Sequence, residues 1–180
     1  MRTVICVLLL AMSAAAQAPA PTVNQILDRD LRSLERQLVP LAETMPAEKY
    51  GFVPTSGEFK GVRTFGQQVS HTAAVVYAVS AAVLGEKNPS EMGPGENGPA
   101  SLKTKDDIVK YLKDAVTYGH KAMGSVTEKS LADLVPSPFG TNKVPRLAMA
   151  TEAVGHSYDH YGQMVVYLRL NGIIPPASRR

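Results

Sequence analysis

Four long segments of this chain repeat their apolar residues at helical spacing, and glycine- or proline-rich stretches separate them. Apolar side chains that recur every three to four residues mark one face of a helix, which must be buried against other elements. No segment alternates polar and apolar residues as a half-buried strand does. The chain is therefore predicted to be all-α, a four-helix bundle with helices over residues 23–45, 64–84, 104–124 and 145–171.

Start and stop signals set the ends of these predicted helices. Either Thr22 or Asn24 can cap the first helix, because both side chains accept hydrogen bonds from free N–H groups. Pro40 lies inside the first apolar pattern and should kink the helix or end its regular part. Pro145 suits the first turn of the last helix, and Asn171 with the following glycine marks its end.

The connections between the later segments are long and irregular. Residues 86–102 and 125–145 are rich in glycine and proline, which break helices. A connection of this length can cross from one end of a bundle to the other. Consecutive helices therefore need not be antiparallel neighbours.

The second segment is the most apolar of the four. Beyond Ser70 it carries almost no strongly polar side chain except His71, and Gly85 ends it. A helix of this kind is covered on most sides. A buried imidazole in such a helix needs polar partners or a metal ion.

The N-terminus has the pattern of a secretory signal peptide. Arg2 supplies the positive charge, residues 4–12 are apolar, and residues 14–16 are alanines suited to cleavage before Gln17. The expected organisation is a cleaved signal over residues 1–16, a linker over 17–22 and one domain over 23–178. Cleavage after Ala18, or an uncleaved anchor, are the alternatives, although the apolar run is shorter than the roughly 20 residues that span a bilayer.

Export has consequences for chemistry and for location. The protein is expected in the periplasm or outside the cell, without stable membrane insertion once the signal is removed. Cys6, the one cysteine, lies in the signal, so the mature chain has no thiol nucleophile, disulfide or cysteine-bound zinc. No nucleophile elbow and no Gly-rich phosphate loop are present either.

The net charge is only +3 and the basic residues are scattered, which argues against a nucleic-acid partner.

The histidines carry the clearest functional signal. His156 and His160 are four residues apart on a predicted helix, so their imidazoles lie on one face and can bind one metal ion. A third ligand must come from elsewhere, and His71 is favoured over His120, which lies near the end of its helix. Three imidazoles leave a coordination position open, as in catalytic sites. Zinc fits such a site, and nickel, iron and manganese are also compatible.

Other polar residues of the last helix are candidates for supporting roles. Glu152 and Asp159 could accept the second N–H of a ligating histidine, or could be solvated surface acids. Gln163 and Tyr167 could line a pocket above the metal, or could simply pack at a helix interface.

Three stretches of the chain resemble one known family, the DinB/YfiT-like metalloenzymes. Residues 156–178, beginning His-Ser-Tyr-Asp-His-Tyr-Gly-Gln, are similar to the last helix and tail of that family. Residues 63–71, Arg-Thr-Phe-Gly-Gln-Gln-Val-Ser-His, resemble the start of its second helix, and residues 84–89 are also similar. The resemblance covers roughly residues 23–178.

This resemblance implies a bundle with up-down-down-up order and a divalent metal, commonly zinc or nickel. It implies that His71, His156 and His160 are the ligands. Dimers are frequent in the family, so a homodimer is one expected state, and the sequence leaves the oligomeric state open. Members of the family act as metal-dependent hydrolases or as transferases that activate a small thiol on the metal.

The function expected from the sequence is therefore an exported divalent-metal-dependent enzyme with a small-molecule substrate. A hydrolase that activates a metal-bound water is favoured, because intracellular thiol cosubstrates are scarce outside the membrane. A thiol S-transferase and a non-catalytic metal-binding bundle are the alternatives.

Overall fold

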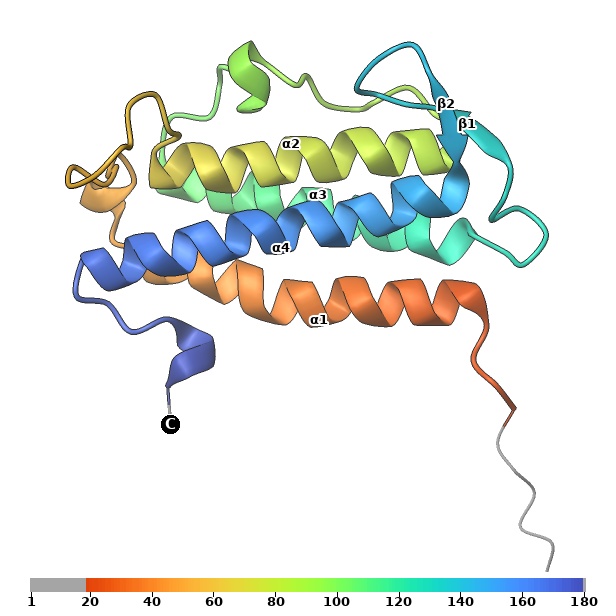
Figure 1. Ribbon diagram of the computed structural model, residues 1–180, viewed down its shortest axis with the longest axis horizontal. Coiled ribbons are helices and arrows are strands. Elements are labelled where there is room, and N and C mark those ends of the chain that lie inside the picture. The colour runs from red at the N-terminus through yellow and green to blue at the C-terminus, as the bar shows by residue number, and fades with distance from the viewer. Residues whose placement is uncertain (1–18, 180) are drawn as a thin grey trace, which may run out of the picture.

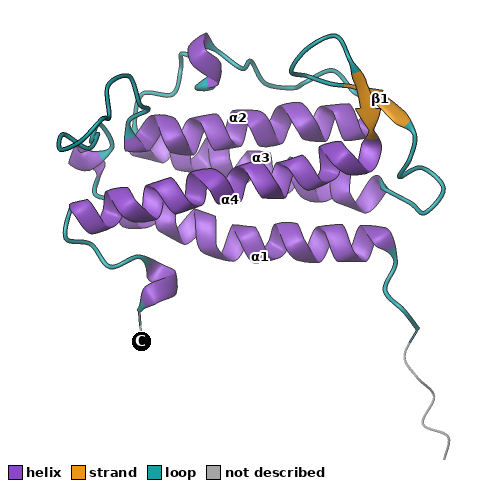
Figure 2. Cartoon of the chain, viewed as in Figure 1, coloured by secondary structure: helices purple, strands orange, loops and turns teal. Residues whose placement is uncertain are grey.

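A computed structural model describes residues 19–179, so the predicted signal peptide and the first two linker residues lie outside the described part. Four long helices form the body of the protein (Figure 1). Short 3-10 turns and one small ribbon lie in the connections, and a further 3-10 turn follows the last helix (Figure 2). The helices are α1 (Val23–Thr44), α2 (Phe65–Leu84), α3 (Lys105–Ser125) and α4 (Arg146–Leu170).

The helices run in up-down-down-up order, which confirms the predicted fold. In Figure 1, α1 and α4 run in one direction while α2 and α3 run in the other. Helix α2 packs against both α3 and α4, and α1 packs against the same two helices, so α1 and α2 lie diagonally across the bundle. Because α2 and α3 are parallel, the segment between them returns along the whole length of α2, as the length of residues 86–102 predicts.

Local sequence signals explain where these helices begin and end. Thr64 accepts a hydrogen bond from the Gln67 N–H, while the Gln67 side chain accepts one from the Thr64 N–H. This reciprocal pair satisfies two N–H groups that the first helical turn leaves free. Thr22, rather than Asn24, is the N-cap of α1, and α1 continues through Pro40 as far as Thr44.

The core is built mainly from α2 and the apolar faces of the helices around it. Sixteen of the twenty residues of α2 are buried, which confirms that it is the central helix. The other three helices each contribute one apolar face and leave the other to solvent. Burial of one leucine or phenylalanine side chain contributes about 1.5–3 kcal/mol, so this core is the main source of stability. Its largest fully buried side chains include Leu31, Leu34, Leu38, Phe65 and Leu112.

A small antiparallel ribbon precedes α4, and the sequence patterns did not predict it. Strand β1 (Leu134–Pro136) pairs with β2 (Lys143–Pro145), with Val135 opposite Val144. Each strand has three residues, too few for a period of two to be recognised. Pro145 ends β2 and is the N-cap of α4, one position before the first helical turn in which the sequence pattern places it.

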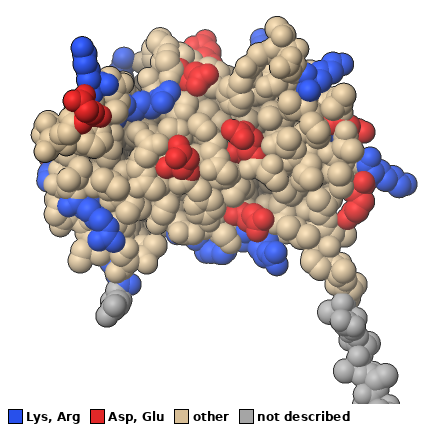
Figure 3. Space-filling view, viewed as in Figure 1, with Lys and Arg blue, Asp and Glu red and all other residues tan. Residues whose placement is uncertain are grey.

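Over residues 19–179, no helix combines the length and the apolar character needed to cross a bilayer. The face in Figure 3 carries acidic side chains over its middle and basic side chains mostly toward its edges. The two signs of charge are mixed on this face.

Candidate metal centre

Helices α2 and α4 bring three histidines together inside the bundle. His71 lies in the second turn of α2, and His156 and His160 lie one turn apart on the facing side of α4. His71 and His160 are buried, with 3% and 5% of their surface exposed, and His156 is half-buried. Residues 85 or more positions apart in the chain thus meet because the two helices pack side by side.

The spacing of the three imidazoles suits a single metal ion. One ring nitrogen of each histidine can be chosen so that all three lie within 4.8 Å of one another. The Nε2 atoms of His71 and His156 are 3.1 Å apart. Two nitrogens bound tetrahedrally at 2.0–2.1 Å would be about 3.3 Å apart, so this pair is already close to the separation that an ion requires. The cluster could therefore hold a metal ion.

The second ring nitrogens of two histidines are held by acceptors. The His71 Nδ1–H donates to the backbone carbonyl of Glu96 at 2.9 Å, and the His160 Nδ1–H donates to the side-chain oxygen of Gln68. A carbonyl oxygen can only accept, so each Nδ1 carries the proton and each Nε2 presents a lone pair. Metal sites use this arrangement to orient their histidines and fix the tautomer.

Burial keeps the cluster neutral. Loss of water around the rings lowers the pKa of His71, His156 and His160 below the ordinary value. For His160 the pKa falls to about 4, through burial and through repulsion from the other two imidazoles. Neutral imidazole is the form that binds metals, so near pH 7 no proton has to leave before an ion can enter.

A chain of amides extends from His160 to the surface. Gln68, which accepts from His160, donates to the side-chain oxygen of Gln163 at 3.0 Å. Gln163 in turn donates to the Asp159 carboxylate at 3.0 Å. Asp159 is thus connected to His160 through two amides rather than by direct contact. Glu152 makes no hydrogen bond to a histidine within residues 19–179, and acts on His156 through its charge, which raises that pKa against the effect of burial.

The two candidate pocket residues lie in different environments. Gln163 lines the cleft described below. Tyr167 is buried, donates its hydroxyl hydrogen to the Arg63 carbonyl at 3.1 Å, and packs edge-on against Phe52. Tyr167 therefore packs at a helix interface and supports the backbone just before α2.

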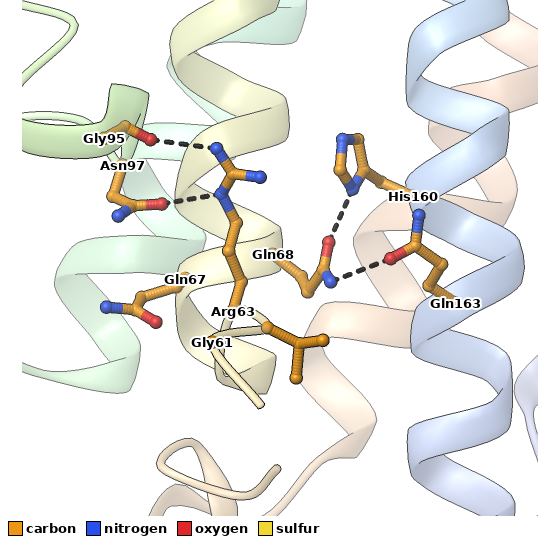
Figure 4. Close-up of a pocket in the computed structure, with 9 residues that line it drawn as sticks. Gly61, Arg63, Gln67, Gln68, Gly95, Asn97, His160 and Gln163 are labelled. Atoms are coloured by element: carbon orange, nitrogen blue, oxygen red, sulfur yellow. Dashed lines mark hydrogen bonds between the residues drawn. The ribbon is translucent and has the colours of Figure 1, made fainter. Parts of the chain in front are cut away.

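A polar cleft opens beside the cluster. It has a volume of about 480 Å³ and reaches His160 at one side and Arg63 at the other (Figure 4). Side-chain amides from Gln67, Gln68 and Gln163 line much of its wall. A cleft of this size admits a small polar molecule to the neighbourhood of the three histidines.

Sequence reasoning missed the contribution of residues 92–98, called the strap below. The Glu96 carbonyl that holds His71 belongs to the strap. Glu96 has a φ of 60°, the only positive φ at a non-glycine residue within the described range. Strain of this kind is found where a backbone group must be held in a defined position. Arg63 fixes the strap from the other side, since its guanidinium donates to the Gly95 carbonyl and to the Asn97 side chain, each at 2.9 Å.

The fourth histidine lies elsewhere. His120 is on α3, where its ring nitrogens contact the carboxylates of Asp28 and Glu35 on α1 at 2.6 and 3.2 Å. It links two helices and does not belong to the three-histidine cluster.

The family model of the DinB superfamily matches residues 30–164 of this chain. The chain belongs to the DinB superfamily. No curated protein sequence matches it.

Solved structures of DinB-like proteins share the fold. A DinB-like protein from Bacillus cereus ATCC 10987 is 18% identical, with a TM-score of 0.64 over 83% of this chain and 93% of that chain. A DinB-like protein from Bacillus subtilis is 19% identical, with a TM-score of 0.63 and coverages of 86% and 99%. A conserved protein from Enterococcus faecalis is 17% identical, with a TM-score of 0.65 and coverages of 84% and 98%.

The amide that holds His160 in this DinB bundle offers a first test of the centre. We expect Gln68→Met to weaken zinc binding by about 10–100-fold, because the His160 Nδ1–H loses its acceptor while the side-chain volume is kept. Gln68→Glu supplies an acceptor again and should restore most of the affinity. Competition with a chelator of known affinity measures both variants. Equal affinities for Gln68→Met and the wild type would contradict the assigned role of this amide.

The pKa of His160 predicts how the metal-free DinB bundle responds to acid. In the unfolded chain this histidine takes up a proton near pH 6.5, whereas in the folded protein it does so only near pH 4. The unfolded state therefore binds more protons between these values, and the free energy of unfolding should decrease as the pH falls from about 6.5 to about 4. Thermal melts of the chelator-treated protein measure this decrease. His160→Asn should flatten the pH profile, and an unchanged profile in that variant would contradict the assignment.

Proposed function

We propose that this chain is an exported, divalent-metal-dependent hydrolase of a small molecule, with zinc or nickel held by His71, His156 and His160. One observation carries the proposal: three neutral imidazoles converge beside a polar cleft, and no fourth histidine, cysteine or carboxylate of residues 19–179 joins them. Three protein ligands with an open side are typical of catalytic metal sites, whereas structural sites are closed by four.

The residues of the chain have defined tasks in this proposal. A bound divalent ion supplies Lewis-acid chemistry, which polarises water or a substrate carbonyl near neutral pH. Glu96 and Gln68 hold the imidazoles of His71 and His160 in the tautomer that exposes Nε2. The amides of Gln68 and Gln163 present a polar wall, which positions a substrate that enters from the cleft.

Hydrolysis is favoured over thiol transfer by the predicted export of the chain. The signal-like N-terminus supports a periplasmic or extracellular location, where small-thiol cosubstrates are scarce and water is not limiting. The mature chain also has no cysteine of its own to take part in thiol exchange.

The proposal is tested by metal content and by turnover. Mature protein purified without a His-tag should contain about one equivalent of zinc or nickel by elemental analysis, or take up one equivalent when either is added. It should then hydrolyse members of an ester and amide panel, and the activity should disappear with chelator and return with metal. Thiol-dependent transfer without hydrolysis would contradict the reaction assigned. Stoichiometric metal with no turnover of either kind would contradict enzymatic function.

A further inference from the structure

The cleft beside the three histidines contains one formally charged side chain, that of Arg63. The remaining lining side chains are amides, His160 and small or apolar groups. Arg63 is half-buried and forms no salt bridge with an acid within residues 19–179. A partly buried positive charge without a counter-ion favours an anion in the space that it faces.

The guanidinium is held in one orientation and keeps one nitrogen free. Its Nε donates to Asn97 and one terminal nitrogen donates to the Gly95 carbonyl. The other terminal nitrogen has no partner among the described residues, and Figure 4 shows it directed across the cleft toward the side where Gln68 and His160 lie. Because its contacts to the strap already restrict the guanidinium, binding through the free nitrogen loses little further side-chain freedom.

The charge of Arg63 also reaches the histidines. Burial is the main cause of the low pKa of His71 and of His160, and the positive charge of Arg63 lowers both further. The same electrostatic field that disfavours imidazolium favours a negative group in the cleft.

The N–H groups at the start of α2 do not compete for this role. The N–H groups of Phe65 and Gly66 donate to the carbonyls of Phe52 and Tyr50, and that of Gln67 donates to Thr64. An anion in the cleft therefore has the Arg63 side chain, and not the helix terminus, as its charged partner.

We propose that Arg63 binds a carboxylate of the substrate at the side of the cleft opposite His160. This inference rests on the proposed function for the role of the ligand as a substrate. A single cation with one free nitrogen suits a monoanionic carboxylate, whereas a phosphate dianion requires more positive charge than the lining supplies. The substrate class is then a small carboxylic acid whose hydrolysable bond lies on the histidine side.

The test is a titration of the full mature protein, followed through its arginine Nε–H signals by NMR. Butyrate is the probe, its neutral amide butyramide is the matched control, and inorganic phosphate tests the other anion. We expect the Arg63 signal, identified from its absence in Arg63→Lys, to shift saturably with butyrate and not with butyramide. The signals of exposed arginines should not shift with the same dependence on butyrate concentration. Three results would overturn the proposal: an equal shift of the Arg63 signal with butyramide, a higher affinity for phosphate than for butyrate, or the same shift in the signals of all arginines.

Two variants separate ligand binding from the structural role of Arg63, with backbone amides of the cleft as the signals. Arg63→Lys keeps the positive charge but loses the planar guanidinium, which donates to the strap and to an anion at the same time. This variant should bind butyrate about tenfold more weakly. Asn97→Ala removes a strap contact but leaves the guanidinium, and should keep the preference for butyrate over butyramide. Loss of that preference in Asn97→Ala, or wild-type affinity for butyrate in Arg63→Lys, would overturn the proposal.

The titration is run with zinc added and again after chelation, so that the two proposals fail separately. Butyrate should bind at Arg63 in both states, because the partner is a side chain of the protein. If zinc does not bind while butyrate does, the proposed function fails and the carboxylate site stands. If zinc binds while butyrate does not, the carboxylate site fails alone.

Discussion

Replacing His71 with alanine is expected to abolish stoichiometric metal binding while the bundle stays folded. His71 is the one member of the three-histidine cluster that lies on α2, and without it only the pair on α4 remains. We expect the affinity for zinc to fall by more than the roughly 10–100-fold that follows loss of an outer-shell partner. Calorimetric titration of zinc into the tag-free protein measures the change, and circular dichroism checks the helices.

The matched control for this prediction is His120→Ala. His120 is also a partly buried histidine, but it contacts Asp28 and Glu35 and lies outside the cluster. The His120→Ala substitution should leave zinc binding unchanged. If His120→Ala lost the metal and His71→Ala kept it, the centre would be misplaced.

The thermal stability of His71→Ala distinguishes a metal site with an open coordination position from a structural site, in which the metal mainly holds α2 and α4 together. Loss of His71 leaves the Glu96 carbonyl without its partner, which costs about 1–3 kcal/mol. In a protein of this size this corresponds to a decrease in Tm of roughly 2–12 °C. A much larger decrease, matched by chelation of the wild type, would show that the metal mainly joins α2 to α4.

Gly93→Ala is expected to destabilise the protein strongly, although Gly93 lies in a connection outside the core. Gly93 has φ 66° and ψ 178°, a backbone conformation that is essentially restricted to glycine. An added Cβ would lie 1.8 Å from the Gly98 carbonyl oxygen, so the strap could not keep its present path. We expect a loss of about 3 kcal/mol, or roughly 6–12 °C in Tm.

The same substitution should also weaken the metal centre at a distance. A displaced strap withdraws the Glu96 carbonyl from His71, so zinc affinity should fall about 10–100-fold although no ligand is changed. Gly124→Ala is the control, since no atom lies within 4 Å of its Cβ position and it is in α3. It should be neutral or slightly stabilising. Wild-type zinc affinity in a folded Gly93→Ala protein would show that the strap does not support the site.

The helices were predictable because their signals are local. Apolar spacing, the threonine caps and the glycine after α2 all act within one or two turns, and the residues themselves determine them. The ribbon before α4 was not predictable, because each of its strands has only three residues, too few to show an alternating pattern. Pro145 was therefore assigned to the helix instead of to the strand that precedes it.

Some residues of the candidate site could also be predicted from local sequence signals, and others could not. The three histidines were found from residue type and spacing, together with the family resemblance. Glu96 was not, because it contributes a backbone carbonyl, and any residue type has one. Gln68 lies one turn before His71 on the same face of α2, which was a usable signal, but glutamine at a helix face is too common to single out.

The distance along the chain between the histidines has a consequence for when the ion can be acquired. His71 and His156 are separated by 85 positions and meet only after α2 and α4 have docked. An ion bound by all three histidines would therefore enter a bundle that has already folded, in contrast to zinc fingers, where the ion drives the chain to fold. Metal binding at this centre would then follow folding, and the metals available in the compartment where the protein folds would influence which ion binds.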